Sequence, residues 1–278
     1  MVEMTMKLSP VRITTFQNEI YGYYHTHGRK LPWRNTTDPY HIVVSEIMLQ
    51  QTQVKRVLTK YDEFIRAFPS FVVLSRASLK EVMKVWKGMG YNRRALALLK
   101  IAHKVVHEYK GKLPDEEKVL VTFPGIGKAT ASSVCTFAYN LPTVFIETNI
   151  RSVFLYYFFK NKEGIDDKEI IPLIQQTLDV ANPREWYYAL MDYGSMLKSK
   201  IDNPSKKSAH YRTQSRFEGS RRQSRGALLR LLSHHDTISL LNAGKELGIT
   251  QEKVKEIAHT LQEEGFLTLT NTQMRMKE

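Results

Sequence analysis

Phe123–Ala131 reads FPGIGKATA and joins two stretches whose apolar residues recur at helical spacing. Gly125 and Gly127 stand one residue apart in it, and Lys128 follows directly. Because glycine lacks a Cβ, such a turn lets backbone N–H groups and the start of the next helix approach a phosphate closely. A Gly-x-Gly pair also serves tight turns for their geometry alone, so the surrounding residues must distinguish the two interpretations.

The chain on both sides of this turn has the pattern of amphipathic helices up to about Lys200. Apolar residues recur three and four apart in VRITTFQNEIYGYY, in YDEFIRAFPSFVVLSRASLKEVMKVW and in RRALALLKIAHKVVHEY, which is helical spacing. Ser78 followed by Glu81 predicts a capping box. Residues 1–198 are therefore predicted to form one mostly helical domain.

A polar segment follows at 199–224 and includes IDNPSKKSAHYRTQSRFEGSRRQS, which is poor in aliphatic residues and rich in cations. Two interpretations remain open for it. Charged polar stretches are often solvated connectors, and the same composition suits a strap that faces DNA. The cations of this strap, counted from the end of the preceding helix, include Lys198, Lys200, Lys206, Lys207, Arg212 and Arg216.

Residues 225–278 are predicted to form a winged helix-turn-helix domain. A first helix is followed by a second, a turn at Gly248, a third helix that begins after Thr250 as N-cap, and a β-rich segment Phe266–Leu269. This order is that of a winged helix, with Val254, Ile257 and Leu261 expected to face inward. Such domains bind DNA or pack against protein, and the acids Glu252, Glu256, Glu263 and Glu264 weigh against insertion into a groove.

Composition narrows the classes of function. The 278 residues carry 41 Lys and Arg against 28 Asp and Glu, a formal charge of +13, and 42% are hydrophobic, which favours a globular protein with a polyanionic partner. No apolar run approaches the roughly 20 residues of a membrane span, and Met1–Pro10 lacks a signal-peptide core, so we expect a cytoplasmic, nucleoid-associated protein. The single cysteine, Cys135, excludes an intrachain disulfide and an all-cysteine metal site.

Two carboxylates flank the glycine turn in sequence. Glu46 stands in the apolar stretch HIVVSEIML, where a carboxyl is expected to have a raised pKa and to donate a proton; a salt bridge with Arg34 or a distant lysine is the alternative. Glu147 precedes TNIRSVFLYYFF, and its alternative is an acid that caps the following helix. Glycosidic bonds are cleaved by pairs of carboxyl groups with different roles. One protonates the leaving group and the other stabilises the cationic sugar.

Six motifs occur in an order that resembles the MutY-type adenine DNA glycosylases of the helix-hairpin-helix (HhH-GPD) superfamily. They are LPWR, SEIMLQQTQV, KGMGYNRRA, FPGIGKATA, IETNIRSV and ALMDYGSM, and they span about residues 10 to 200. The resemblance implies a mostly α, helix-hairpin-helix DNA glycosylase fold with two helical subdomains. The predicted C-terminal winged-helix (α+β) domain would follow that fold.

The resemblance also implies roles for individual residues. Glu46 matches the catalytic acid that protonates a flipped adenine at N7, and Arg34 matches an arginine near that carboxyl. Glu147 stands at the second carboxylate, and Asn149 matches an asparagine that orients it. Gln51 and Tyr91 match residues that wedge into the duplex where a base is extruded, although Tyr91 could also be ordinary core. The implied DNA-binding residues are Gln51, Thr52, Tyr91, Arg94, Gly125, Gly127, Lys128 and Thr130.

The chain departs from the family's pattern at several positions. The second carboxylate is Glu147 where the family has aspartate, and the longer side chain places the substrate in doubt. Bifunctional relatives carry a Schiff-base lysine where this chain has Ala129, so we expect no strand cleavage. The segment from Leu197 to Arg222 has no cysteine where most relatives hold a [4Fe–4S] cluster, so we expect no cofactor and no metal. The winged helix stands where familiar adenine glycosylases carry the domain that recognises 8-oxoguanine.

These observations predict a monofunctional DNA glycosylase of base excision repair that removes adenine opposite 8-oxoguanine or guanine from double-stranded DNA. Two alternatives stay open: a glycosylase for thymine or uracil opposite guanine, and a DNA-binding protein without catalytic activity. We expect a monomer that does not associate with membranes.

Overall fold

The protein is described by a computed structural model covering residues 6–201, 203–213 and 216–277. Asp202, Gln214 and Ser215, which belong to the predicted segment 199–224, lie outside the described residues. The chain forms two compact units: Met1–Ile42, Asp115–Val121 and Ile126–Thr213 make the first, and Val43–Pro114, Thr122–Gly125 and Gln214–Glu278 make the second. Helix α2 (Pro39–Leu49) begins in the first unit and ends in the second.

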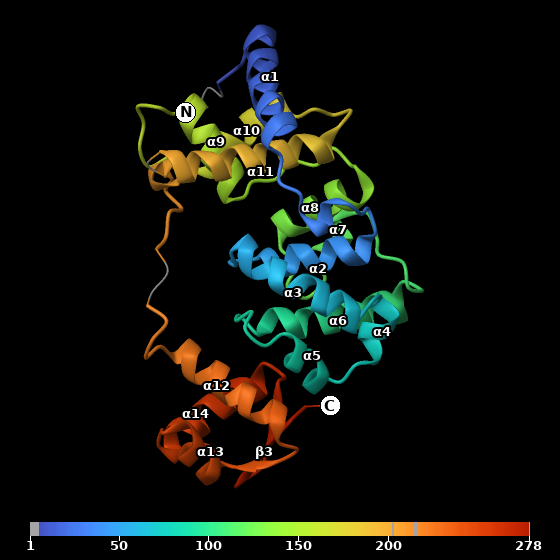
Figure 1. The fold of residues 1–278 in the computed structure, drawn as a ribbon, viewed down its shortest axis with the longest axis vertical. Coiled ribbons are helices and arrows are strands. Elements are labelled where there is room, and N and C mark those ends of the chain that lie inside the picture. Colours follow the sequence, from blue (N-terminus) through green and yellow to red (C-terminus); the bar gives the residue numbers. More distant parts are fainter. Residues whose placement is uncertain (1–5, 202, 214–215, 278) are drawn as a thin grey trace. The chain divides into compact units, whose positions relative to one another are not determined.

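The first unit is helical, as its apolar spacing predicts. Its elements are α1 (Pro10–His27), η1 (Pro32–Arg34), α7 (Glu117–Leu120), α8 (Lys128–Tyr139), α9 (Thr148–Phe158), α10 (Asp167–Thr177), α11 (Pro183–Lys200) and η2 (Pro204–Lys207). Helix α11 packs on both α9 and α1 (Figure 1). Phe16 of α1 meets Phe154 and Trp186 edge-on, the geometry that aromatic pairs prefer.

The first half of the polar segment packs against the first unit. Helix η2 lies on α9, where Ser205 is 3% exposed and its hydroxyl is 2.6 Å from that of Ser152. Ile165 and Ser208 form an isolated β-bridge just beyond it. Residues 209–213 and 216–219 are exposed. The segment is therefore partly buried as far as Ser208 and continuously exposed only over the described residues that follow Ser208, up to Gly219.

The second unit combines helices from the middle of the chain with its C-terminal part. Its elements are the end of α2, then α3 (Val54–Ala67), α4 (Phe71–Arg76), α5 (Leu79–Val85), α6 (Arg93–Glu108), α12 (Arg221–His234), β1 (Ile238–Ser239), α13 (Leu240–Leu247), α14 (Gln251–Glu263), β2 (Leu267–Leu269) and β3 (Gln273–Met276). Phe64 packs edge-on against Trp86 in the core of α3 and α5. The predicted capping box at Ser78 and Glu81 is confirmed at the start of α5.

Residues 221–277, called the C-terminal domain below, have the predicted winged-helix order. Gly248 ends α13 with φ +64°, Thr250 caps α14, and the apolar residues predicted to face inward are buried. The three strands form an antiparallel sheet in the order β1-β3-β2. Sequence analysis missed β1, because a two-residue strand has no alternation that a pattern could reveal.

An acidic side chain joins the C-terminal domain to the start of α6. Glu264, which follows α14, accepts hydrogen bonds from Arg93 of α6 and from Arg225 of α12. The side chains of Glu264 and Arg225 are only 13% and 19% exposed. A charge-assisted pair shielded in this way is stronger than an exposed one. Lys80 of α5 and Asp236 add a second ion pair between the same parts.

The stability that Glu264 provides should disappear in acid. Burial would raise the pKa of Glu264, but the hydrogen bonds from Arg93 and Arg225 outweigh it and lower the pKa from 4.5 to about 2. The contribution is therefore present above about pH 4.5 and is lost as the pH falls toward 2. We expect Glu264→Gln to cost about 2 kcal/mol at pH 6.5 and much less near pH 2. Urea unfolding of both proteins at the two pH values tests this; an equal cost at both would contradict it.

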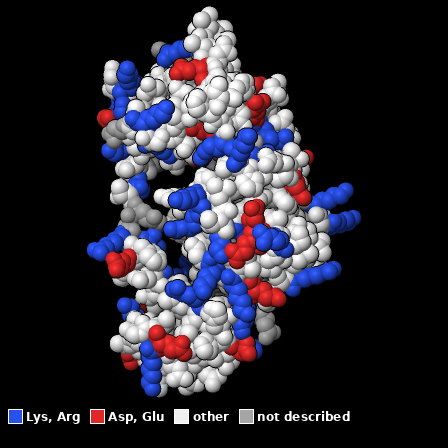
Figure 2. Space-filling view, viewed as in Figure 1, with Lys and Arg blue, Asp and Glu red and all other residues white. Residues whose placement is uncertain are grey.

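Charge is spread over the surface. Figure 2 shows Lys and Arg side chains over much of one face, with Asp and Glu side chains among them. The described helices include none long and apolar enough to cross a membrane.

Candidate active site

Glu46 lies at the border between the buried and accessible faces of α2. Val43, Val44 and Ile47 are fully buried, whereas Glu46 is partly exposed. A carboxyl in this position has apolar atoms around its stem and can still meet a substrate. This setting suits a general acid.

The C-terminal end of α2 is held by the guanidinium of Arg94. Its Nη1 donates to the carbonyl oxygens of Met48 and Gln50, both at 2.6 Å, and more weakly to that of Ile47 at 3.2 Å. Its Nη2 donates to Met89 at 3.1 Å and to Gly90 at 3.2 Å. A cation at a helix C-terminus also interacts favourably with the helix dipole.

Arg94 therefore differs from its predicted role. The resemblance implies a DNA-binding residue, but Arg94 is 7% exposed and its donors are directed at backbone carbonyls. Burial lowers the pKa of Arg94 to about 10, so it remains a cation at neutral pH. It connects the helix that carries Glu46 to the loop that carries Tyr91, and so acts as a positioning residue.

Both predicted wedge residues have a left-handed backbone. Gln51 has φ +52° just after α2, and Tyr91 has φ +45° in the loop between α5 and α6. Residues other than glycine rarely adopt this conformation, and it is retained where the surroundings fix it. The Arg94 guanidinium lies 5.3 Å from the centre of the Tyr91 ring. Tyr91 is thus a partly exposed loop residue and not ordinary core.

The two glycines of the hairpin have different tasks. Gly125 has φ +77°, and a Cβ there would lie 2.8 Å from the Cβ of Ala97 in α6, so glycine is required on both counts. Gly127 is the N-cap of α8, has no side-chain cap and would leave a Cβ in open space. Gln50 donates to the carbonyl of Gly125 at 3.1 Å. Gly127 and Lys128 are exposed, as a phosphate contact requires.

Glu147 is the N-cap of α9. The alternative that Glu147 is an acid capping the following helix therefore describes its local structure. Its Oε1 accepts from the backbone N–H groups of Asn149 at 2.8 Å and Ile150 at 2.9 Å, and its Oε2 accepts from the Asn149 amide at 3.2 Å. Three donors fix the carboxylate at the positive end of a helix. Capping and catalysis are compatible, because a carboxylate that stabilises a cation must first be held in place.

Lys198 completes this group and is a residue whose role sequence analysis missed. It was assigned to the basic strap, but its Nζ donates to Oδ1 of Asn149 at 3.0 Å. Burial lowers the pKa of Lys198, while the charge of Glu147 opposes that shift. The amide of Asn149 is therefore oriented from both sides, by Glu147 and by Lys198. No motif marked Lys198, since its partner lies 49 residues away.

Gly194 lets α11 approach the start of α9. A Cβ on Gly194 would lie 2.2 Å from the carbonyl oxygen of Asn149, a distance that no structure tolerates. The approach of α11 to α9 at this point is closer than alanine permits. Gly194 therefore sets the position of the backbone that carries Glu147 and Asn149.

We expect Gly194→Ala to push α9 away from α11. The added methyl should cost about 1–3 kcal/mol of stability, and the displacement of Glu147 should slow the predicted cleavage of the glycosidic bond about 100-fold. Urea unfolding and single-turnover excision measure the two effects. Gly22→Ala is the matched control, because a Cβ at this helical glycine meets nothing within 4 Å; equal behaviour of the two variants would contradict the prediction.

Arg34 is bound to a carboxylate of α11. Its two terminal nitrogens each donate to Asp192 at 2.8 Å, and its proximity to Glu46 stays a prediction. Arg29 donates to the same carboxylate. Burial favours the neutral form of Asp192, but the hydrogen bonds from Arg34 and Arg29 outweigh it and lower the pKa. Arg34 thus fastens η1 to α11 through a buried ion pair.

The candidate site residues fall into two groups by unit. Glu147, Asn149 and Arg34 belong to the first unit, together with Lys128 and Thr130 at the start of α8. The second unit contains Glu46, Gln51, Thr52, Tyr91, Arg94 and Gly125.

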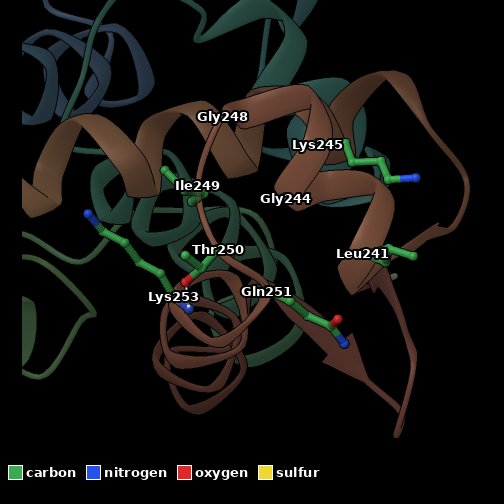
Figure 3. Close-up of a pocket in the computed structure, with 8 residues that line it drawn as sticks. All are labelled: Leu241, Gly244, Lys245, Gly248, Ile249, Thr250, Gln251 and Lys253. Carbon is green, nitrogen blue, oxygen red and sulfur yellow. Dashed lines mark hydrogen bonds between the residues drawn. The ribbon is translucent and has the colours of Figure 1, made fainter.

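The C-terminal domain has a shallow cleft at its helix-turn-helix. The lining residues are Leu241, Gly244, Lys245, Gly248, Ile249, Thr250, Gln251 and Lys253. Figure 3 shows that Lys245 and Lys253 extend in opposite directions. Their charges do not converge on one point of the cleft, which is not the arrangement that grips a single phosphate.

The helical scaffold, the glycine hairpin and the flanking carboxylates define a DNA glycosylase fold of the helix-hairpin-helix class. Residues 44–177 match the family described as "HhH-GPD superfamily base excision DNA repair protein". The chain belongs to this superfamily.

Curated relatives are adenine DNA glycosylases. One from Buchnera aphidicola (subsp. Baizongia pistaciae) is 36% identical over 194 residues, which cover 68% of this chain and 54% of the relative. The human protein is 31% identical over 198 residues, 66% of this chain and 36% of the relative. The chain thus matches about half or less of the length of these relatives.

Solved structures share the fold. A thermostable thymine-DNA glycosylase superposes with a TM-score of 0.62 at 26% identity, over 71% of this chain and 96% of that one. An endonuclease III bound to DNA superposes with a TM-score of 0.54 at 15% identity, over 78% of this chain and 94% of that one, and shows the fold alone.

The chain cannot supply the four cysteines of an iron–sulfur cluster. Its single cysteine, Cys135, is buried in α8 and donates to the carbonyl of Asp115 at 3.0 Å. The described residues show no group of three His, Cys, Asp or Glu side chains arranged to hold a metal ion. Lys198 at the end of α11 binds Asn149, and η2, which follows α11, packs on α9.

Proposed function

We propose that this chain is a monofunctional DNA glycosylase that hydrolyses the N-glycosidic bond of a flipped, mispaired adenine, opposite 8-oxoguanine or guanine. The observation that carries the proposal is the 36% identity to an adenine DNA glycosylase. The chain also has an acid in α2, Glu46, and a carboxylate that caps α9, Glu147. Glu46 protonates N7 of adenine, the bond from C1′ to N9 breaks, and Glu147 stabilises the cationic sugar until water adds to C1′.

The hairpin, the wedge residues and exposed cations bind the DNA. The start of α8 contacts a phosphate through Gly127 and Lys128, and Gln51 and Tyr91 fill the gap left by the extruded base. Ala129 offers no amine at the position that forms a Schiff base in bifunctional relatives. The product is therefore an intact strand with an abasic site.

A second candidate is removal of thymine or uracil opposite guanine. A specific observation favours it: this chain covers 96% of the thymine-DNA glycosylase structure but only 54% of the Buchnera adenine glycosylase. Glu147 in place of the family's aspartate adds weight, because it changes the reach of the carboxylate. The third candidate, a DNA-binding protein without activity, predicts tight binding and no abasic product.

Single-turnover incubation with labelled duplexes separates the three candidates. The panel is adenine opposite 8-oxoguanine, adenine opposite guanine, and thymine or uracil opposite guanine, each developed with and without alkali. We expect alkali-dependent cleavage at adenine. Cleavage at a pyrimidine alone would move the assignment to the second candidate, cleavage without alkali would contradict monofunctional hydrolysis, and no product would favour the third.

The exposed cations of the strap should contribute to DNA affinity. Lys200, Lys206 and Arg212 are exposed, whereas Lys198 is bound to Asn149. Replacing Lys200, Lys206 and Arg212 by glutamine should reduce the slope of log affinity against log salt by up to about 3, one for each phosphate that the protein no longer neutralises. Fluorescence anisotropy between 50 and roughly 200 mM salt measures the slope; an unchanged slope would show that the strap does not touch DNA.

A further inference from the structure

The C-terminal domain contacts the loop that carries Tyr91. Nη1 of Arg222, in α12, donates to the hydroxyl of Tyr91 at 3.3 Å. Arg93, two residues after Tyr91, is a second point of contact. It donates to Glu264, which also accepts a hydrogen bond from Arg225 of α12. Helix α12 also packs directly on α5, which ends just before the loop. The loop is thus held from the side of the C-terminal domain at two points.

The loop itself has a conformation that needs support. Gly88, Gly90 and Tyr91 all have positive φ, at +91°, +67° and +45°. Arg94 of α6, which also binds the end of α2, donates to the carbonyls of Met89 and Gly90 in this loop. Arg222 is the complementary contact, since it acts on the end of the Tyr91 side chain, whereas Arg94 acts on the backbone and the ring face.

The exposed surface of α14 carries acids as well as the lysines Lys253 and Lys255. In a helix-turn-helix, this helix would enter the major groove. Glu252 and Glu263 are exposed on it, and Glu256 is 66% exposed beside Arg221. Acids on a groove-facing helix would repel phosphates. The residue of α12 that is bonded to Tyr91 is instead an arginine, Arg222.

We propose that the C-terminal domain braces the loop between α5 and α6 that carries Tyr91 (residues 86–92, the wedge loop) and that Arg222 is the positioning residue that orients the Tyr91 side chain before it enters the duplex. This inference rests on the proposed function. A wedge held in its inserted orientation loses less conformational freedom when the base is extruded. The domain thereby assists base extrusion without contacting bases.

The test compares Arg222→Met, Tyr91→Phe and the double variant with wild type. Methionine keeps an apolar stem but cannot donate, and phenylalanine keeps the ring but cannot accept. Arg221→Met is the matched control: Arg221 is the neighbouring cation of α12, and it binds Thr260 and Glu256 inside the C-terminal domain. It removes the same charge without touching Tyr91.

The first readout is hydrogen exchange of residues 88–92 in the protein without DNA. Arg222→Met and Tyr91→Phe should each speed exchange about tenfold, the double variant no more than either, and Arg221→Met should have no effect. Unchanged exchange in Arg222→Met would overturn the brace. This readout does not depend on catalysis, so it stands even if the proposed function fails.

The second readout is extrusion, followed by the fluorescence of 2-aminopurine placed beside the target base in duplexes that the protein acts on. The same non-additive pattern, with about tenfold slower extrusion, supports the brace. If Arg222 instead contacts a phosphate, Arg222→Met should weaken binding to undamaged duplex and reduce the salt slope by about 1. The effect of Arg222→Met should then be just as large in the Tyr91→Phe background. That pattern would overturn the proposal.

Discussion

Glu46→Gln should lose about 100- to 10,000-fold of the single-turnover rate of base excision, the contribution typical of a general acid. Glutamine has nearly the same shape, so α2 and its buried neighbours Val43, Val44 and Ile47 should keep their packing. Only the transferable proton is removed. Affinity for the duplex should change little, since the contacts assigned to DNA lie on other residues.

The control for this variant is Glu63→Gln, which makes the same change on α3 at a residue that is 49% exposed and pairs with Lys60. Its rate should equal that of wild type. Circular dichroism and anisotropy show whether the fold and DNA binding survive in both variants. Undiminished excision of adenine by Glu46→Gln would exclude Glu46 as the proton donor.

Arg94→Met should have the largest effect on stability. The substitution removes the guanidinium that donates to the carbonyls of Met48, Gln50 and Met89. Arg94 is only 7% exposed, so water cannot easily replace the lost donor. Each unsatisfied buried acceptor costs about 1–3 kcal/mol, and partial relaxation should leave a total of about 3–5 kcal/mol. Excision should fall as well, because both the end of α2 and the Tyr91 loop lose their shared anchor.

Arg94→Lys separates shape from charge. An ammonium is a single point, whereas the planar guanidinium has two arms that reach different segments, so lysine should recover only a small part of the loss. Lys100→Met, at an exposed cation on the same helix, should stay within about 0.5 kcal/mol of wild type. Urea unfolding measures all three. Full recovery by lysine would show that charge alone matters at this position.

Local signals in the sequence predicted a good deal of the fold. The helical periodicity, the capping box at Ser78, the turn at Gly248 and the N-cap at Thr250 all occur where the pattern placed them. Each depends on residues within one or two turns of one another. The ordered motifs likewise predicted the superfamily, because a motif is a local pattern too.

The partners of charged residues could not be predicted in this way. Arg34 is bound to Asp192, 158 residues away, which no motif indicated. Arg94 was expected on DNA and binds the carbonyls at the end of α2 and in the loop that carries Tyr91. Lys198 was placed in a strap and instead orients Asn149. The sequence contains many carboxylates and carbonyls that could accept a hydrogen bond from each of these side chains. Tertiary packing decides which of these acceptors each side chain binds.

The sequence by itself determined the helices, their caps, the glycine hairpin, the two candidate carboxylates and the lack of cysteine ligands, because these depend on short spacings and residue identity. Tertiary structure decided that Lys198 binds Asn149, that Gly194 must be glycine, and that the C-terminal domain meets Tyr91 through Arg222. Those outcomes follow from close packing of helices distant in sequence, where a gap of one methyl group or the direction of one guanidinium fixes the contact, and no local pattern records it.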